Sequence, residues 1–215
     1  MKKLVIFDLD GTLLNTIDDL GFASNHALAE AGMPTHHISA YPHFVGNGIT
    51  KLIERVVPSD QCNPETVARL RESFVEYYDV HMADHTRPYP GIPELLESLT
   101  ERGIGVAVTS NKYQSATEKL ILTFFPDIPW VAIAGQKEGV PVKPDPSIVF
   151  GVLAEHPAPK AEVLYTGDSG VDMETARRAG IESVAVTWGF CSLRDLAMTY
   201  PDHIIDSPSQ LLDFV

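Results

Sequence analysis

Apolar and polar residues follow two different patterns along this chain. At residues 4–7, and again from residue 88 onward, short apolar runs alternate with segments in which apolar positions recur every three or four residues. Short runs indicate buried strands, and the longer period indicates amphipathic helices. The predicted strands are 4–7, 104–109, 130–134, 162–166, 183–187 and 203–205. The predicted helices are 93–102, 114–124, one from about 145, 171–179, a short one from Ser192 and a closing helix. This alternation is typical of an α/β fold with a parallel sheet.

The stretch from residue 15 to residue 86 has a helical pattern only. Its first helix begins after Thr16 as the N-cap and stops at Gly32, and a short second helix ends at Pro58. A third opens with Asn63 as N-cap and Pro64 as its first residue. This stretch therefore interrupts an α/β domain just after its first strand.

The domain boundaries follow from this interruption. Residues 1–14 and 88–215 are predicted to form the α/β core, and residues 15–87 an all-helical insert. Pro88, Pro90 and Gly91 form a cluster of helix and strand breakers, which indicates a linker or hinge at the end of the insert. A core with a mobile lid is the expected architecture.

Composition and charge narrow the classes of function. The 215 residues carry a formal net charge of −13, which argues against nucleic acid or an anionic membrane surface as a partner. No segment has the length and hydrophobicity of a membrane span. Cys62 and Cys191 match no zinc or redox spacing, so we expect free thiols and a cytoplasmic protein. An anionic substrate would need local cations or a bound metal.

Carboxylates follow two of the predicted strands. The apolar run 4–7 ends in Asp8 and Asp10, and Asp168 follows the strand 162–166. In open α/β sheets, ligands bind at the carboxyl ends of the strands. Acids converging there would form an oxygen-rich site for Mg²⁺. The alternative for Asp8 and Asp10 is an Asx turn completed by Gly11.

Other strand ends supply groups that could bind an anion. Ser110 and Asn111 follow the strand 104–109. Lys143 precedes Pro144-Asp145-Pro146, which opens a helix, and the flanking prolines give this lysine a definite direction. Asp172 begins the helix after Asp168. Each group also has an ordinary explanation, since Ser-Asn is a common helix cap and most lysines are solvated.

Taken together, these motifs resemble a known family. Asp8-Leu9-Asp10-Gly11-Thr12, then Ser110, Lys143 and Gly167-Asp168-x-x-x-Asp172 look like the four ordered motifs of the haloacid-dehalogenase-like hydrolase superfamily. The resemblance spans nearly the whole chain and implies a Rossmann-like core. The insert is similar to that superfamily's C1-type cap. Val45-Gly46-Asn47-Gly48 and Arg87-Pro88-Tyr89-Pro90-Gly91 further resemble the phosphoglycolate phosphatase branch.

The resemblance implies a role for each matching residue. Asp8 would be the nucleophile that forms an aspartyl-phosphate, and Asp10 the general acid and base. Mg²⁺ would be held by Asp8, the Asp10 backbone carbonyl and Asp168. The remaining expected roles are phosphate binding by Ser110, Asn111 and Lys143, and orientation of Lys143 or of a metal-bound water by Asp172. Asp10 argues against a true dehalogenase, whose reaction needs no such acid.

Two questions stay open at the level of sequence. Thr109 competes with Ser110 as the phosphate-binding hydroxyl, although Thr109 would point to the other face of the strand. In the insert, the loop Gly46-Asn47-Gly48 and Arg55 could bind a substrate carboxylate. Alternatively, the glycines only allow a turn and Arg55 is solvated.

The leading hypothesis is a Mg²⁺-dependent phosphatase for a small phosphomonoester, with 2-phosphoglycolate as the best guess. The alternatives are a phosphomutase of the β-phosphoglucomutase type and a pyrophosphatase or nucleotidase of the same superfamily. A non-catalytic receiver-like module is a further hypothesis, but a receiver has no reason to carry a large insert. The expected partner is a small phosphorylated substrate, and the expected state is a monomer or a homodimer.

Overall fold

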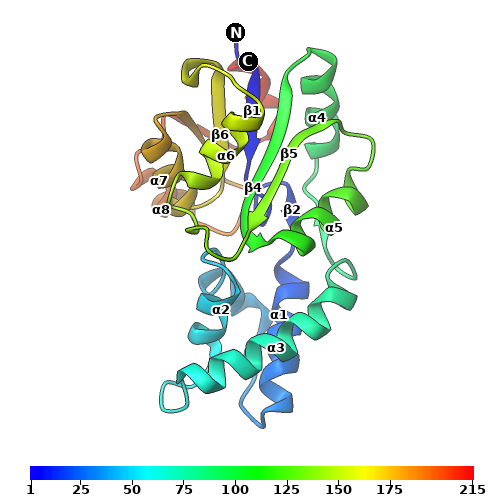
Figure 1. Cartoon of the computed structure of the whole chain (residues 1–215), viewed down its shortest axis with the longest axis vertical. Helices are drawn as coiled ribbons and strands as arrows, with labels where there is room; N and C mark the ends of the chain where they lie inside the picture. Colours follow the sequence, from blue (N-terminus) through cyan, green and yellow to red (C-terminus); the bar gives the residue numbers. More distant parts are fainter. The chain divides into compact units, whose positions relative to one another are not determined.

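The protein divides into two compact units in a computed structural model that describes all residues, 1–215. The first unit comprises Met1–Asn15 and Pro88–Val215, and the second comprises Thr16–Arg87. Figure 1 shows the course of the chain through both, from blue to red. No helix in either unit has the length and apolar character needed to cross a membrane.

A six-stranded parallel sheet forms the centre of the first unit, in the order β5-β4-β1-β6-β7-β8. Its strands are β1 (Leu4–Phe7), β4 (Gly105–Tyr113), β5 (Trp130–Gln136), β6 (Val163–Gly167), β7 (Glu182–Val186) and β8 (His203–Ile205). The predicted α/β class and parallel sheet are therefore confirmed. Strand β1 is buried along its whole length between β4 and β6, which explains why its sequence is continuously apolar.

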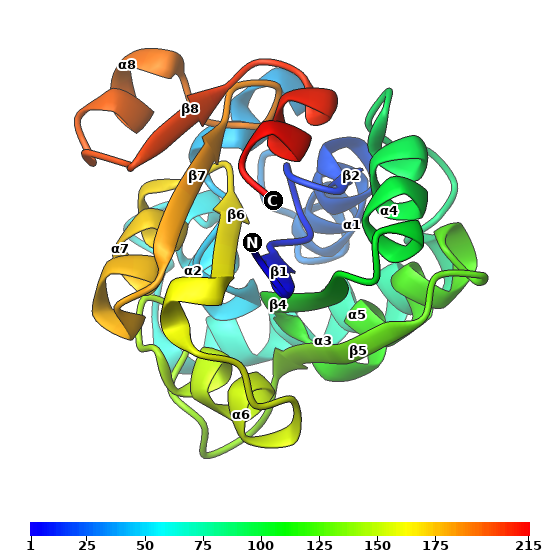
Figure 2. The same ribbon diagram turned by 90° about the horizontal axis from the view of Figure 1, so that it is seen from above.

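Helices cover both faces of this sheet. They are α4 (Ile92–Glu101), α5 (Gln114–Phe124), α6 (Ser147–Glu155), α7 (Gly170–Ala179), α8 (Leu193–Ala197) and the 3-10 helices η2 (Lys160–Glu162) and η3 (Pro208–Asp213). Figure 2 shows α6 and α7 on one side of the sheet and α4 and α5 on the other. Leu4 and Ile6 of β1 pack with α6 and α7, through Val149 and Ala176 among others. The expected closing helix is a 3-10 helix.

One difference from the expected strands affects the site. Strand β4 was expected to end at residue 109, but it continues to Tyr113 and therefore includes Ser110, Asn111 and Lys112. The pairing of β4 with β5 is irregular between Thr109 and Tyr113. The polar residues extend the strand because their backbone still pairs with β5 after the apolar pattern has ended.

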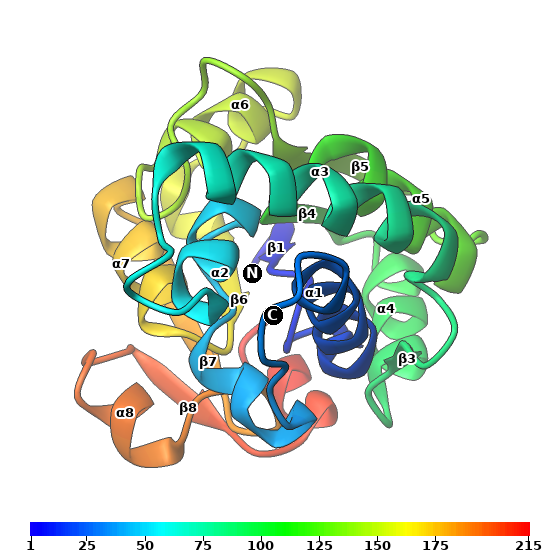
Figure 3. The same cartoon turned by 90° about the horizontal axis from the view of Figure 1, so that it is seen from below.

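The second unit is helical. It consists of α1 (Ile17–Glu30), the 3-10 helix η1 (Ile38–His43), α2 (Ile49–Val56) and α3 (Pro64–His81), and α3 packs on both α1 and α2 (Figure 3). Two short strands, β2 (Leu14–Asn15) and β3 (Arg87–Pro88), pair where the chain passes between the units. Asn63 caps α3 as expected, through a hydrogen bond that its side chain accepts from Thr66 N. Thr16 occupies the N-cap position of α1 but makes no side-chain cap.

The chain connection at the end of the second unit is held by a buried carboxylate. Asp19 of α1 accepts hydrogen bonds from the backbone N–H groups of His85 and Thr86 and from the Thr86 hydroxyl. Asp19 is only 3% exposed. These bonds compensate the cost of burying the charge, and they fix the last residues of the second unit against its first helix.

Candidate active site

Asp8 lies at the carboxyl end of the central strand. Its backbone N–H donates to Thr166 O at 2.9 Å, which continues the pairing of β1 with β6 and fixes the position of the residue. The side chain is nearly buried, with the residue 8% exposed. One carboxylate oxygen, Oδ1, accepts a hydrogen bond from Lys143, whereas Oδ2 accepts none from the protein. Asp8 is therefore fixed in position, and its Oδ2 atom is left without a hydrogen-bond donor from the protein.

Lys143 joins the carboxylates of two strand ends. Its ammonium lies 2.8 Å from Asp8 Oδ1, 2.7 Å from Asp172 Oδ1 and 3.0 Å from Thr109 O. These acceptors use all three of its N–H bonds. Burial lowers the pKa of Lys143, but the negative charges of Asp172 and Asp8 outweigh this effect and raise the pKa overall. The lysine is therefore charged at neutral pH and is not a surface lysine, since the residue is 2% exposed.

Asp8, Asp168 and Asp172 form a buried carboxylate cluster with oxygen atoms within 4.8 Å of one another. Burial and the charge of Asp172 raise the pKa of Asp8 to about 7, although Lys143 acts in the opposite direction. Burial and the charges of Asp172 and Asp8 raise the pKa of Asp168 well above its ordinary value. A cluster of hard oxygen donors that repel one another fits a divalent cation such as Mg²⁺ or Ca²⁺.

Asp172 is held in this cluster by hydrogen bonds from other protein groups. Its Oδ1 accepts from Lys143, and its Oδ2 accepts from the Ser169 hydroxyl and backbone N–H in the capping box of α7. Both oxygens are therefore already used by protein donors. This arrangement suits a residue that positions Lys143 better than one that binds a metal directly.

Two glycines allow the acidic loops to approach each other. Gly11 has a φ of +86°, and a Cβ on it would lie 2.2 Å from Asp168 Oδ2. A Cβ on Gly167 would lie 2.3 Å from Asp172 Cβ. Any larger residue at these positions would push Asp168 or Asp172 out of the cluster.

The polar end of β4 contributes to the site in a way that the sequence did not predict. Thr109 Oγ1 is hydrogen bonded to the buried Tyr165 hydroxyl at 2.9 Å, so it lies among the core residues of the sheet. Ser110 Oγ instead accepts from Lys112 N. Asn111, the other residue predicted to bind phosphate, donates from its amide to Lys143 O and accepts from Lys143 N, at 3.1 and 2.8 Å. Asn111 thus anchors the backbone of the central lysine.

Asp10 and Lys112 form a second, more open charged pair. Lys112 Nζ lies 3.3 Å from Asp10 Oδ1, and the side chain of Asp10 is 19% exposed while that of Lys112 is 4% exposed. The partial exposure of Asp10 suits a group that exchanges protons with substrate and water.

Four further residues, to which the sequence assigned no role, line the acidic loops. Phe190 N donates to Asp168 Oδ2 at 2.7 Å, the Thr12 hydroxyl donates to Asp168 Oδ1 at 3.3 Å, and Trp188 Nε1 donates to Thr12 O at 3.0 Å. Burial and the charges of Asp168 and Asp10 raise the pKa of Tyr89. Trp188 and Phe190 could have been found from the sequence, since they lie in the loop that follows strand β7 at the same edge of the sheet.

The predicted substrate loop lies in the second unit. Gly46 and Gly48 both have positive φ values, of 107° and 79°, which explains the choice of glycine there. Arg55 Nη1 donates to Phe44 O at 2.8 Å, and its Nη2 donates to Asn47 Oδ1 at 2.6 Å. The guanidinium of Arg55 therefore holds the loop in shape.

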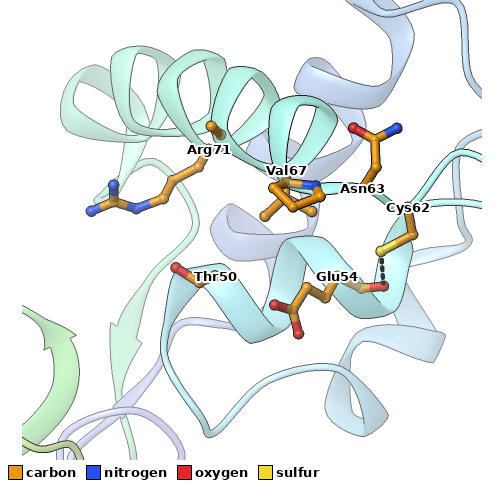
Figure 4. A pocket seen from close by; sticks show the side chains of 8 residues that line it. Thr50, Glu54, Cys62, Asn63, Val67 and Arg71 are labelled. Atoms are coloured by element: carbon orange, nitrogen blue, oxygen red, sulfur yellow. Dashed lines mark hydrogen bonds between the residues drawn. The ribbon is translucent and has the colours of Figure 1, made fainter.

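A pocket of about 410 Å³ also lies in the second unit, between α2 and the start of α3. Figure 4 shows its lining, with the thiol of Cys62 directed at the backbone carbonyl of Glu54. Both cysteines are free thiols, as expected, and Cys62 is exposed. The pocket contains none of the carboxylates described above.

Comparison with known proteins agrees with this geometry. Residues 5–186 match the family described as haloacid dehalogenase-like hydrolase. The phosphoglycolate phosphatase of Mannheimia succiniciproducens is 31% identical, over 99% of this chain and 98% of that protein. The phosphoglycolate phosphatase of Agrobacterium fabrum is 34% identical, over 96% of this chain and 89% of that protein.

A solved structure also matches along nearly the whole chain. It is described as a predicted phosphoglycolate phosphatase from Haemophilus somnus, with a TM-score of 0.91 and 28% identity, over 99% of this chain and 97% of that one. The ordered motifs, the parallel sheet with acidic strand ends and the extent of these matches lead to one conclusion. The chain belongs to the haloacid dehalogenase-like hydrolase family.

Proposed function

We propose that the protein is a Mg²⁺-dependent phosphatase that hydrolyses a small phosphomonoester, with 2-phosphoglycolate as the first candidate. The observation that carries the proposal is Asp8, held at the end of β1 by Lys143 with one oxygen uncommitted. The names of the two relatives described above support the substrate class. The buried carboxylate cluster supports the need for a divalent metal.

In the first half of the reaction, a carboxylate oxygen of Asp8 attacks phosphorus in line with the ester bond. A bond forms between Asp8 and phosphorus, the ester P–O bond breaks, and Asp10 donates its proton to the leaving oxygen. Lys143 holds the orientation of Asp8 and offsets the negative charge around the transferred group. Ser110 would hold a phosphoryl oxygen through its hydroxyl.

In the second half, Asp10 acts as the base. A water molecule loses its proton to Asp10 and attacks the phosphorus of the aspartyl-phosphate, which releases inorganic phosphate and restores Asp8. Because Asp10 is partly exposed, it can reach both the leaving group and water. Asp172 keeps Lys143 in place through both steps.

The metal would be held by Asp8, Asp168 and the backbone carbonyl of Asp10. When bound, Mg²⁺ supplies positive charge that draws phosphoryl oxygens and the Asp8 carboxylate together. Thr12 and the backbone of Phe190 orient Asp168 for this role.

The second unit would act as a cap that closes over the substrate and excludes water before the attack. The loop Gly46-Asn47-Gly48, which Arg55 supports, would contribute substrate contacts from this cap. We place the enzyme in the cytoplasm, where its exposed Cys62 thiol would remain reduced. The proposal concerns a small phosphorylated substrate and requires neither nucleic acid nor a membrane.

The test is phosphate release from a panel of phosphomonoesters, pyrophosphate and nucleotides, in Mg²⁺ and in EDTA. We expect 2-phosphoglycolate to have the highest kcat/KM and EDTA to abolish turnover. Addition of Mg²⁺ after EDTA should restore it. Phosphate transfer to a sugar that depends on a bisphosphate activator would identify a mutase instead, and no turnover of any ester would refute the proposal.

Proton competition should weaken Mg²⁺ binding below neutral pH. The metal needs charged carboxylates, and the pKa of Asp8 is raised to about 7. From Asp8 alone we expect binding to be about tenfold weaker at pH 6 than at pH 8, and the raised pKa of Asp168 adds to this change. Isothermal titration of Mg²⁺ at both pH values measures the effect directly.

The Asp8→Asn variant is the matched control for this titration. Its position 8 no longer titrates, so it should bind Mg²⁺ more weakly at pH 8 and show a smaller change with pH. Equal affinities of the native protein at pH 6 and pH 8 would contradict the raised pKa of the cluster.

A further inference from the structure

We infer that Trp188 is a positioning residue for Asp168, the carboxylate proposed to bind Mg²⁺, and that it acts by fastening the loop at residues 188–190 to the loop that follows β1. This inference rests on the proposed function and adds to it the device that fixes a metal ligand. It concerns residues of the first unit only. It assigns Trp188 no contact with the substrate or with the metal itself.

The order of the strands places Asp168 between two other loops. Asp168 directly follows β6, and β6 lies between β1 and β7 in the sheet. The loop after β1 carries Gly11 and Thr12, and the loop after β7 carries residues 188–190. The metal ligand is therefore flanked by the loops of both neighbouring strands, and whatever joins these two loops also confines the carboxylate between them.

The contacts of Asp168 show how the two loops hold it. Phe190 N donates to Oδ2 at 2.7 Å, and the Thr12 hydroxyl donates to Oδ1 at 3.3 Å. Gly189 lies so close that a Cβ on it would be 2.4 Å from Oδ2 and 2.4 Å from Gly11 O. Oδ2 is thus enclosed between the loops, whereas Oδ1 has one bond, longer than the roughly 2.5–3.0 Å usual for a hydroxyl donor. Oδ1 is the oxygen left to bind a cation.

Trp188 joins the two loops directly. Its indole Nε1–H donates to Thr12 O at 3.0 Å, so the residue whose hydroxyl reaches Asp168 Oδ1 is tied through its own carbonyl to the loop that holds Oδ2. The indole has no other donor, and Phe at this position would keep the ring but lose the bond. Loss of groups that orient a metal ligand typically weakens metal binding by about 10- to 100-fold.

The experiment is calorimetric titration of Mg²⁺, without substrate, into the native protein, Trp188→Phe and Trp130→Phe. We expect Trp188→Phe to bind Mg²⁺ about tenfold more weakly than the native protein. Trp130→Phe is the matched control, since the Trp130 indole also donates to a backbone carbonyl, Phe125 O at 3.4 Å. Trp130 is the first residue of β5, at the opposite end of the strands from Asp168, and its replacement should change the Mg²⁺ affinity less than about twofold.

Dependence on the Mg²⁺ concentration distinguishes positioning from general structural damage. In phosphate release by Trp188→Phe, the half-saturating Mg²⁺ concentration should rise about tenfold, while kcat at saturating Mg²⁺ should stay within about threefold of native. The melting temperatures of the two variants in EDTA should agree within a few degrees. A loss of kcat that excess Mg²⁺ does not restore, or a Mg²⁺ affinity of Trp188→Phe within about twofold of native, would overturn the inference.

A second measurement leaves Trp188 in place. The chain has two tryptophans, so Trp130→Phe retains Trp188 as its single indole fluorophore. Mg²⁺ should change the emission of this protein with the same Kd as in calorimetry, because Trp188 is bonded to the loop that carries part of the metal site. Unchanged emission at Mg²⁺ concentrations that saturate the site would contradict the inference.

The outcomes also separate this inference from the proposed function. If Trp188→Phe binds Mg²⁺ as tightly as the native protein and the native protein hydrolyses phosphomonoesters, the function stands and the role of Trp188 is refuted. If the native protein binds Mg²⁺ but hydrolyses no ester, the function fails, and the affinities of the variants still decide the role of Trp188. If the native protein binds no Mg²⁺, both fail together.

Discussion

Replacement of Asp8 by Asn should lower kcat for phosphate release by about 10⁴-fold or more, since the covalent intermediate cannot form without this carboxylate. An amide oxygen is a poor nucleophile, and the uncommitted oxygen of Asp8 becomes either a neutral oxygen or an N–H donor. The variant should also fail to incorporate phosphate that survives denaturation in acid, whereas the native enzyme should trap it. Initial rates of phosphate release and acid-quenched labelling measure the two effects.

The fold should survive this substitution. The Asn oxygen can still accept from Lys143, and removal of one buried negative charge relieves both the burial cost and the repulsion by Asp172 that raise the pKa of Asp8. We therefore expect a melting temperature within a few degrees of the native value. Asp127→Asn, at an exposed aspartate of the same unit, is the matched control and should leave kcat unchanged. Activity of Asp8→Asn above about 1% of native would exclude Asp8 as the nucleophile.

Lys143→Met should have the largest combined effect on stability and activity. It leaves Asp8, Asp172 and the carbonyl of Thr109 without their shared cation in a buried site. Removal of one partner from a buried ionic network typically lowers the free energy of unfolding by about 3–5 kcal/mol. We expect a fall of this size in urea denaturation, together with a decrease in kcat of about 10³-fold.

Mg²⁺ separates the two effects of Lys143→Met. The cation should recover part of the lost stability, because it offsets the repulsion among the same carboxylates, but it should not recover kcat. Lys137→Met, at an exposed lysine, is the control and should change neither quantity. A Lys143→Met variant that is as stable as the native protein would show that the cluster does not depend on this ion pair.

The sequence by itself determined the fold class and much of the site. The continuous apolar run at 4–7 indicates a strand buried on both faces, and the acids that follow such strands meet at one edge of a parallel sheet. Asp8 and Asp168 were located in this way, and the structure gathers them with Asp172. The helices of the second unit were also predictable, because their apolar periodicity is a local property of the chain, as is the Asn63 cap of α3.

The tertiary structure decided what the polar groups at those strand ends do. Asn111, expected to bind phosphate, fastens the backbone of Lys143, and Thr109 pairs with Tyr165 of the neighbouring strand. Phe190 and Thr12 hold Asp168, and their local sequence does not show that Asp168 is their partner. Periodicity reports which face of an element is buried, but the partner of a hydrogen bond depends on residues brought together from distant parts of the chain. That pairing exists only once the sheet has formed.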